Sequence, residues 1–301
     1  MGLTSSSDVK LRPIVYLNGA FIPDNEATVS VFDRGYLFGD GVYEVVPVIN
    51  GQLVDKEYFL QRLTRSLGEL KIKAPCSDEE LMRMLRKLVM LNDIKEGMVY
   101  MQVTRGVALQ RTFNFPTAGT KPSLMAFATK AAIMNSPQAQ GIKVVSTTDI
   151  RWKRRDIKSL QLLGQVMAKE DAVQEGAKEG WMCEDGYVTE GCSSSAYIVI
   201  KGNTVVTRPC NYEILPGVRR RTIVEIVKGH ETYHLEERAF TLEEAYHAEE
   251  AFISSASNIV VPVVDIDGKT IGTGVPGPVT LALRGIYLER LAKESGLMIN
   301  E

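Results

Sequence analysis

Asn135-Ser136-Pro137-Gln138-Ala139-Gln140-Gly141 is the stretch that divides this chain of 301 residues. It has no apolar periodicity and combines proline with glycine, a composition typical of a connection between folded units. We therefore predict a linker over residues 135–141, one domain over residues 1–134 and a second over residues 142–301. With 45% hydrophobic side chains, a chain of this length can bury a substantial core.

Upstream of the linker, the pattern indicates antiparallel strands followed by helices. Asn18-Gly19 and Asn50-Gly51 are dipeptides that supply the positive φ angles of tight hairpin turns. Apolar residues then recur at helical spacing in two segments, and Ser77-Asp78-Glu79-Glu80 resembles a capping box before the second. The predicted strands are Ile14–Ile22 with its central turn, Ala27–Phe32, Val42–Ile49, Gln52–Val54, Met98–Thr104 and Ser123–Thr129, and the predicted helices are Lys56–Leu70 and a segment around Leu81–Leu88.

Downstream of the linker, strands and helices follow one another without a regular alternation. The predicted strands are Ile142–Thr147, Gly180–Met182, Tyr187–Thr189, Ala196–Ile200, Thr204–Thr207, Ala251–Ser254 and Val260–Ile266. The predicted helices are Ser159–Gly176, Gly217–Lys228, a short one capped at Thr241 and Val279–Lys293. This mixture predicts an α+β fold rather than a doubly wound parallel sheet.

Composition excludes several classes of protein. The net charge of −2 leaves no excess to bind a polyanion, and the basic clusters Lys153–Arg155 and Arg219–Arg221 lack the interleaved aromatic residues of a nucleic-acid platform. Apolar runs fall short of the roughly 20 residues that a membrane span needs, and Met1–Lys10 does not resemble an export signal. We therefore expect a cytoplasmic protein with no membrane or nucleic-acid partner. The four cysteines and three histidines show no ligand spacing, which predicts reduced thiols and no metal.

Four passages carry more special residues than packing requires. Asp33–Glu44 is rich in glycine, which lets backbone approach a ligand closely. Lys158 lies where a basic run meets an apolar segment, so desolvation and neighbouring cations could lower the pKa of its amine and make it nucleophilic. Glu190 precedes small and hydroxyl-bearing residues, and Leu215–Arg221 contains a helix start that can bind phosphate. Alone, each passage is more simply explained as an irregular connection, a solvated charged face or a turn.

Together, these passages resemble the class IV pyridoxal-phosphate-dependent aminotransferases, and most of all the D-amino-acid aminotransferases. The likeness extends from about Tyr16 to Gly268. The motifs that carry it are Asp33-Arg34-Gly35-Tyr36-x-Phe38-Gly39-Asp40-Gly41-x-Tyr43-Glu44, Asp156-Ile157-Lys158-Ser159-Leu160, Thr189-Glu190-Gly191, Leu215-x-Gly217 and Val263-x-x-Ile266-Asp267-Gly268. The resemblance implies a two-domain fold with a C-terminal pseudo-barrel, the cofactor pyridoxal 5′-phosphate and a homodimer.

The resemblance also implies roles for individual residues. Lys158 would form the Schiff base with the cofactor and act as general acid and base. Glu190 would keep the pyridine nitrogen protonated, so that the ring can accept electrons. Leu215 would pack against the ring. The phosphate would be bound by Arg62, by the backbone N–H groups of Val218 and Arg219, and by the Ser255-Ala256 turn.

On the substrate side, the chain departs from the family pattern. Tyr43 matches a tyrosine that lines the carboxylate side of the D-amino-acid enzymes. Their substrate loop carries Arg-x-His, and the corresponding residues here are Arg111-Thr112-Phe113, in a loop one residue longer. Because Phe113 cannot donate the histidine's hydrogen bond, the substrate carboxylate would depend on Tyr43 and Arg111 or on another arginine. Ser195 also stands where the family commonly has asparagine.

The predicted function is therefore transfer of an amino group from a D-amino acid to a 2-oxo acid. An (R)-selective amine transaminase is an alternative, because Phe113 makes the carboxylate side more apolar. An aminodeoxychorismate lyase would share the fold and cofactor. Branched-chain L-amino-acid transamination fits less well, because the loop over residues 33–44 follows the D-specific pattern. A non-catalytic scaffold also fits less well, because Lys158 and Glu190 are both intact.

Overall fold

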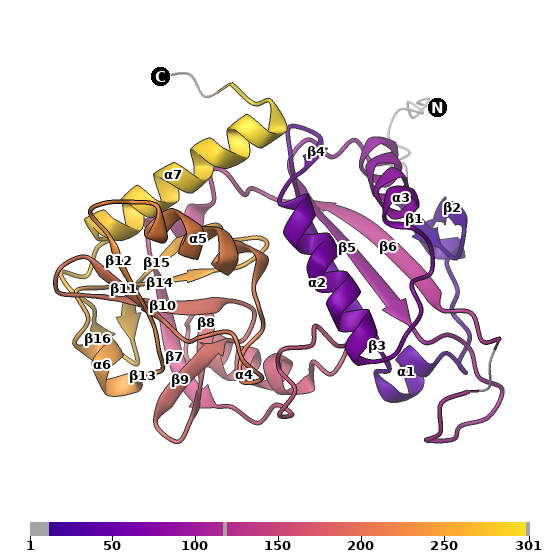
Figure 1. The fold of residues 1–301 in the computed structure, drawn as a ribbon, viewed down its shortest axis with the longest axis horizontal. Helices are drawn as coiled ribbons and strands as arrows, with labels where there is room; N and C mark the ends of the chain where they lie inside the picture. The colour runs from indigo at the N-terminus through magenta and orange to yellow at the C-terminus, as the bar shows by residue number, and fades with distance from the viewer. Residues whose placement is uncertain (1–11, 117–118, 299–301) are drawn as a thin grey trace, which may run out of the picture.

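The computed structural model describes residues 12–116 and 119–298 and contains two β-sheets. Figure 1 shows them as two lobes, the N-terminal one coloured indigo to magenta and the C-terminal one rose to yellow. Residues 131–141 connect the lobes and include the 3-10 helix η2 (Pro137–Gln140). The predicted linker thus lies between the two sheets, and the division into two domains there stays a prediction.

The N-terminal sheet has six antiparallel strands in the order β2-β1-β6-β5-β3-β4. They are β1 (Ile14–Leu17), β2 (Ala20–Pro23), β3 (Gly41–Ile49), β4 (Gln52–Leu53), β5 (Gly97–Thr104) and β6 (Ser123–Lys130), with the 3-10 helix η1 (Asp24–Glu26) after β2. Both predicted hairpins are confirmed. Their turns have φ angles of 47° and 106° at Asn18-Gly19 and of 52° and 72° at Asn50-Gly51, as a tight turn that matches the strand twist requires.

Helices α2 (Lys56–Glu69) and α3 (Asp78–Leu91) pack their apolar faces on this sheet. Both are confirmed, and Ser77 and Glu80 form the predicted capping box at the start of α3. Strand β3 divides its side chains by alternation. Val42, Val46 and Val48 pack in the core with the helices, whereas Tyr43, Val45 and Pro47 line a pocket on the other face.

The predicted strand over Ala27–Phe32 is wrong. Its apolar side chains are largely exposed, with Val31 64% exposed, and the backbone makes a local turn in which Asp33 N donates to Ser30 O at 3.0 Å. The alternation of β-branched residues therefore does not correspond to strand pairing among residues 12–116 and 119–298. The next segment forms the short helix α1 (Arg34–Phe38), which the sequence pattern did not predict and which Asp33 caps by accepting from Gly35 N at 2.8 Å.

The C-terminal sheet is mixed and follows the order β12-β11-β10-β14-β15-β7-β8-β9-β13, with β16 (Lys269–Thr270) paired to β15. Its other strands are β7 (Ile142–Thr148), β8 (Glu179–Glu184), β9 (Tyr187–Gly191), β10 (Ser195–Ile200), β11 (Thr204–Thr207), β12 (His234–Glu237), β13 (Phe240–Thr241), β14 (Glu250–Ser254) and β15 (Val261–Ile266). The seven strands predicted for this half are confirmed, whereas β12, β13 and β16 were not predicted.

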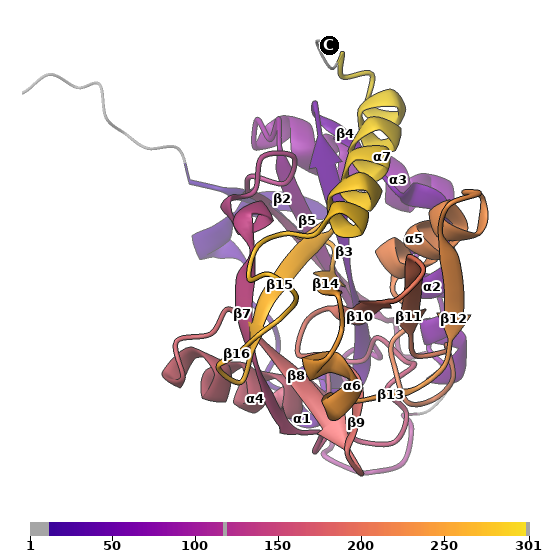
Figure 2. The same ribbon diagram turned by 90° about the vertical axis from the view of Figure 1, so that its left-hand side faces the viewer.

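This sheet must curl, because of how its strands are connected. Strands β9 and β10 follow each other in the chain, but β14, β15, β7 and β8 lie between them in the sheet. Five steps across a flat sheet would be about 24 Å, whereas the chain from Gly191 to Ser195 can span at most about 14 Å. The two strand ends therefore come together only if the sheet bends, as its strands do in Figure 2. The expected C-terminal pseudo-barrel is this curled sheet.

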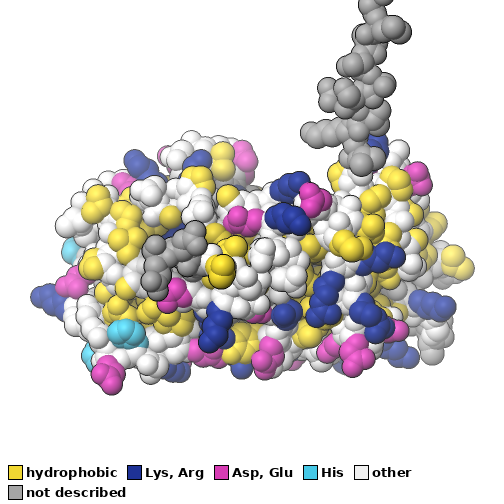
Figure 3. Space-filling model, turned by 90° about the horizontal axis from the view of Figure 1, so that it is seen from above, with side chains coloured by type: hydrophobic (Ala, Val, Ile, Leu, Met, Phe, Trp, Pro, Cys, Tyr) yellow, Lys and Arg dark blue, Asp and Glu magenta, His cyan; other side chains and the backbone are white. Residues whose placement is uncertain are grey.

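The helices of the C-terminal lobe are α4 (Leu163–Gln174), α5 (Val218–Lys228), α6 (Leu242–Tyr246) and α7 (Pro278–Ser295). The helix predicted over Ser159–Gly176 begins later, at Leu163. The preceding residues instead run alongside β3, where Leu160 N donates to Gly41 O at 3.0 Å. No helix in residues 12–116 and 119–298 is long and apolar enough to cross a membrane. On the face seen in Figure 3, basic and acidic side chains are interspersed.

Candidate active site

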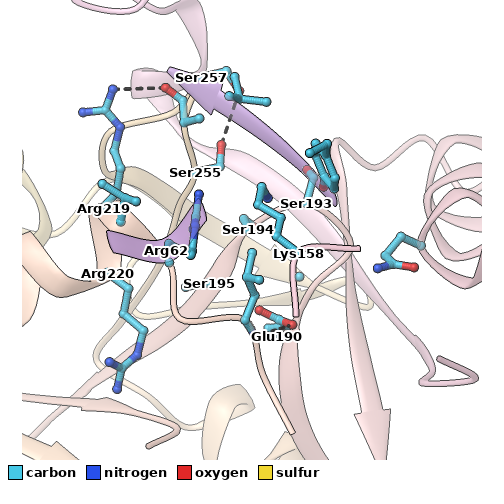
Figure 4. Close-up of a pocket in the computed structure, with 18 of the residues that line it drawn as sticks. Arg62, Lys158, Glu190, Ser193, Ser194, Ser195, Arg219, Arg220, Ser255 and Ser257 are labelled. Atoms are coloured by element: carbon cyan, nitrogen blue, oxygen red, sulfur yellow. Dashed lines mark hydrogen bonds between the residues drawn. The ribbon is translucent and has the colours of Figure 1, made fainter. Parts of the chain in front are cut away.

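A pocket of about 420 Å³ lies between the two lobes. The N-terminal sheet supplies one wall, and the other side is formed by the Glu190–Ser195 segment, the start of α5 and the turn after β14. Of the residues predicted for the site, nine line this pocket: Tyr43, Arg62, Lys158, Glu190, Leu215, Val218, Arg219, Ser255 and Ala256. Residues distant in the sequence thus meet in one cavity (Figure 4).

Lys158 is held by a short extended segment that pairs with the start of β3. Tyr43 N donates to Lys158 O at 3.0 Å, and Ser159 forms a β-bridge with Val42. Gly41 leaves room for this segment, because a Cβ there would lie 2.7 Å from Leu160 Cδ1, besides 2.6 Å from Val103 O on β5. The half-buried Lys158 side chain enters the pocket, with its Nζ 4.3 Å from the centroid of the Tyr43 ring. A positioned amine of this kind can act as a nucleophile or transfer a proton.

Glu190 is buried at the end of β9 and is oriented through one of its two oxygens. Its Oε1 accepts from Arg151 Nη1 at 2.5 Å and from Leu215 N at 3.1 Å. Oε2 has no hydrogen-bond donor among the described residues, so it remains available to a ligand. Burial raises the pKa of Glu190, and the adjacent Arg151 opposes this rise. The site therefore offers a fixed carboxylate oxygen to a cationic group.

Arg151 belongs to a buried charge network that the sequence analysis missed. It donates to Asp149 from Nε at 2.9 Å and from Nη2 at 2.7 Å, besides its bond to Glu190. Thr189 Oγ1 donates to Asp149 at 2.6 Å, and Arg155 faces the same carboxylate at 3.4 Å. Although burial acts in the opposite direction, the hydrogen bonds from Arg151 hold the pKa of Asp149 below its ordinary value. Arg151 lies only seven residues before Lys158, but nothing in the local pattern indicates its pairing with Glu190.

Arg62 projects from α2 into the opposite end of the pocket. Its Nε and Nη2 donate to the two oxygens of Glu44 at 2.8 and 2.6 Å, and Nη1 donates to Pro216 O at 3.2 Å. Burial alone would lower the pKa of Arg62, but Glu44 raises it above the ordinary value. Two of the five guanidinium N–H groups have no partner among the residues that the structure describes and can bind an anion.

The start of α5 lies beside Arg62 and adds further donors. Gly217 is the N-cap, so the backbone N–H groups of Val218 and Arg219 have no acceptor within the helix. A Cβ on Gly217 would lie 2.9 Å from Ser195 Oγ, which shows how closely the backbone is packed here. The guanidinium, the helix start and the turn at Ser255 surround one end of the pocket (Figure 4). Such a set of donors is suited to a phosphate group.

An aromatic row forms the wall beside Lys158. The rings of Tyr43 and Tyr100 stack with centroids 5.6 Å apart, and those of Tyr100 and Phe127 stack at 5.0 Å. Burial raises the pKa of Tyr100 to about 12, so its hydroxyl is protonated and donates to Gln102 at 3.0 Å. The sequence analysis identified Tyr43 but missed Tyr100 and Phe127. The three rings line up because of how their strands pair, and the sequence pattern did not predict which strands pair.

Arg111 and Phe113 are exposed and do not line this pocket. The Arg111 guanidinium lies over the Phe38 ring at 5.1 Å and over the Phe113 ring at 5.6 Å. Arg34 anchors their loop by donating to Thr112 O at 2.9 Å. Within one chain, then, these two residues are not brought together with Tyr43.

The fold is shared with solved aminotransferase structures. The branched-chain amino acid aminotransferase of Escherichia coli superimposes with a TM-score of 0.86 at 22% identity, covering 97% of both chains. The branched-chain amino acid aminotransferase of Thermobaculum terrenum, solved in its PLP-form, gives a TM-score of 0.80 at 22% identity, covering 95% of both chains. At this level of identity the similarity establishes the fold, and the expected α+β class IV aminotransferase fold is confirmed.

Sequence comparison then defines the family. Residues 41–266 match the family described as amino-transferase class IV. The D-alanine aminotransferase of Staphylococcus haemolyticus is 42% identical over 270 residues, which are 90% of this chain and 95% of that protein. The D-alanine aminotransferase of Bacillus licheniformis is 38% identical over 283 residues, 93% of this chain and 99% of that protein. This chain therefore belongs to the class IV aminotransferases, enzymes that use pyridoxal 5′-phosphate.

The pocket fits this cofactor. Lys158 presents an amine to the cofactor aldehyde, and Glu190 presents a free carboxylate oxygen to the ring nitrogen. The groups around Arg62 present hydrogen-bond donors to the phosphate.

Proposed function

We propose that this aminotransferase transfers the amino group of a D-amino acid to a 2-oxo acid. The observation that carries the proposal is the placement of Lys158 Nζ 4.3 Å from the Tyr43 ring, in the pocket that Glu190 also lines. Relatives named D-alanine aminotransferase, 42% and 38% identical to this chain over nearly their whole length, support D-amino acids as donors.

Lys158 has two tasks in this proposal. Its amine would hold the cofactor through the aldehyde. With substrate bound, its Nζ would take the proton from the substrate α-carbon and return a proton when the product forms. The bound cofactor supplies an electron sink for the pair left on that carbon. The Tyr43 ring, over which Nζ lies, restricts where the amine can move.

Glu190 and Arg62 orient the cofactor from opposite ends. Glu190 Oε2 would accept a hydrogen bond from the protonated ring nitrogen, while Arg151 and Leu215 N hold Oε1 in place. Arg62, the N–H groups of Val218 and Arg219, and the Ser255-Ala256 turn would bind the phosphate. The Leu215 side chain would pack against the ring.

In this proposal the phosphate takes the remaining N–H groups of Arg62, so the substrate carboxylate is bound by a cation from outside this pocket. The arginines that line it among the described residues are all paired with carboxylates: Arg62 with Glu44, Arg151 with Asp149 and Glu190, Arg155 with Glu184, Arg219 with Asp55, and Arg220 with Glu237. We therefore propose a homodimer in which Arg111 of the partner subunit reaches the substrate carboxylate beside Tyr43. Phe113 of the partner subunit would add an apolar contact. The cytoplasmic location stays a prediction.

A donor panel tests the function. The purified enzyme, loaded with pyridoxal 5′-phosphate, is offered D-alanine, D-glutamate, their L-enantiomers and both enantiomers of 1-phenylethylamine, with pyruvate or 2-oxoglutarate as acceptor. We expect transfer from the D-amino acids. Transfer only from the (R)-amine would favour the amine transaminase that Phe113 suggests, and pyruvate release from aminodeoxychorismate without an acceptor would favour the lyase.

Arg111→Ala tests the carboxylate assignment. The KM for D-alanine should rise by at least about tenfold, the loss expected from one charge-assisted hydrogen bond. Arg86→Ala is the matched control, since Arg86 is an exposed arginine of α3 outside the pocket. Unchanged D-alanine kinetics in Arg111→Ala would overturn the assignment of Arg111 without affecting that of Lys158.

A further inference from the structure

The side chain of Arg219 connects the segments that surround the phosphate end of the pocket. It is buried, and its Nη2 donates to Ala256 O at 3.0 Å, in the turn that follows β14. Figure 4 shows it leaving the start of α5 toward that turn. Its Nη1 forms an ion pair with Asp55 Oδ2 at 3.2 Å, and the guanidinium lies 5.2 Å from the Tyr287 ring centroid.

Two residues of α7 hold Asp55 in place. It is the N-cap of α2, is 7% exposed and has a left-handed backbone with φ of 57°. Its backbone N–H donates to the Glu294 carboxylate at 3.1 Å, and Tyr287 Oη donates to its Oδ2 at 3.1 Å. Its carboxylate therefore has a defined position, and the start of α2 is tied to α7 as well as to α5.

The Asp55–Arg219 pair thus joins elements of both lobes. Helix α2 carries Arg62 two turns after Asp55, about 10 Å along the helix. Helix α5 carries the free N–H groups of Val218 and Arg219, and the turn contains Ser255 and Ala256. These are the groups that the proposed site assigns to the phosphate. A shift of one lobe against the other would separate Arg62 from the remaining donors.

We propose that Asp55 and the Arg219 side chain are positioning residues for the cofactor phosphate, because their ion pair holds Arg62, the start of α5 and the Ser255-Ala256 turn at the spacing that one phosphate requires. The proposal rests on the proposed site, in which these donors bind the phosphate. Asp55 does not itself bind the anion. It keeps the guanidinium in place and balances its charge, so that the hydrogen bond to the turn persists.

Comparing pyridoxal 5′-phosphate with pyridoxal, which lacks the phosphate, tests the proposal. Dissociation constants of both ligands are measured for apo parent and Asp55→Asn by absorbance titration, below the melting temperature of each protein. We expect the variant to bind the phosphorylated ligand at least about tenfold more weakly. Its affinity for pyridoxal should stay within about twofold of the parent value, since Lys158 and Glu190 are untouched.

Glu237→Gln is the matched control. It changes the ion pair of the next arginine on α5, the buried Arg220, at 2.9 Å, without touching the turn at Ala256. It should leave the ratio of the two affinities unchanged. If Asp55→Asn does not fold, Tyr287→Phe removes only the hydroxyl that holds Asp55 and should shift the ratio in the same direction, by about two- to threefold.

The outcomes separate the two hypotheses. An equal loss for both ligands in Asp55→Asn, or no loss for either, would overturn the positioning role. Failure of the parent to give a visible absorption shift with both ligands, or an unchanged shift in Lys158→Ala, would instead overturn the proposed site.

Discussion

Replacing Arg151 with methionine tests the buried charge network at the floor of the pocket. The Arg151 side chain is 4% exposed and donates two hydrogen bonds to Asp149, at 2.9 and 2.7 Å, and one to Glu190 at 2.5 Å. A charge-assisted hydrogen bond contributes about 1.5–3 kcal/mol, and removing one partner of a buried ion pair costs about 3–5 kcal/mol. Because Arg155 still faces Asp149 at 3.4 Å, we expect the free energy of unfolding to fall by about 3–5 kcal/mol rather than by the full sum of three bonds.

The pH dependence of stability should change in a defined direction. Burial raises the pKa of Glu190 and Arg151 opposes the rise, so Arg151→Met should raise that pKa further. A carboxyl whose folded pKa exceeds its unfolded value of about 4.3 takes up a proton on folding, and its contribution grows as pH falls through the folded pKa. Stability should therefore begin to rise on acidification at a higher pH in the variant than in the parent.

Asp149 works in the opposite sense. Its pKa in the parent is lowered, because the hydrogen bonds from Arg151 outweigh its burial. Its stabilisation is thus present above the unfolded pKa of about 3.9 and lost as pH falls through the lower folded value. Without Arg151, Asp149 contributes less stability, so less stability should be lost as the pH falls.

Urea unfolding of the apo proteins between about pH 3 and 8, followed by circular dichroism, measures both effects. Arg238→Met is the matched control, because the Arg238 side chain is 39% exposed and its partners Glu236 and Glu244 are 47% and 40% exposed, so its ion pairs should contribute less than about 1 kcal/mol. A loss below about 1 kcal/mol for Arg151→Met, together with an unchanged pH profile, would refute this account of the network.

Three further changes separate chemistry from structure. Lys158→Ala should abolish transamination and the visible absorption shift of the cofactor, while leaving the melting temperature within about 3 °C, because the half-buried amine mainly contacts the Tyr43 ring. Glu190→Gln should retain cofactor binding in absorbance titrations but lower kcat at least about 100-fold, since a neutral amide cannot keep the ring nitrogen protonated; near-parental kcat would contradict the role of Glu190. Gly41→Ala should destabilise the protein by about 1–3 kcal/mol in urea, because its Cβ would lie 2.6 Å from Val103 O; unchanged stability would show that the strand can yield there.

Local patterns predicted most of the elements. The Asn-Gly dipeptides place both hairpin turns, and the Ser77 and Thr241 capping boxes mark two helix starts. Two predictions failed where tertiary contacts outweighed local preference. Ala27–Phe32 has strand-like alternation but no pairing strand in the described chain, and residues 159–162 run along β3 instead of extending α4 toward its N-terminus.

The site was predicted only where resemblance supplied it. Lys158, Glu190 and Arg62 were identified from family motifs, and the structure brings them into one pocket. The pairs that hold them were not foreseeable, because Arg62 pairs with Glu44 and Arg151 with Glu190 across contacts that depend on how strands and helices pack. Local periodicity specifies which face of an element is buried, but not which charged residue it meets there.

The alternation of β3 has a consequence for redesigning substrate range. Val45 and Pro47 line the pocket at every second position after Tyr43, while Val46 between them packs in the core behind the sheet and Glu44 pairs with Arg62. Lys158 and Glu190 lie on other segments of the chain. Replacing Val45 or Pro47 with smaller or larger side chains would thus resize the cavity without disturbing either the groups that perform the reaction or the packing that supports them. Libraries confined to these positions would sample new donors at little risk to folding.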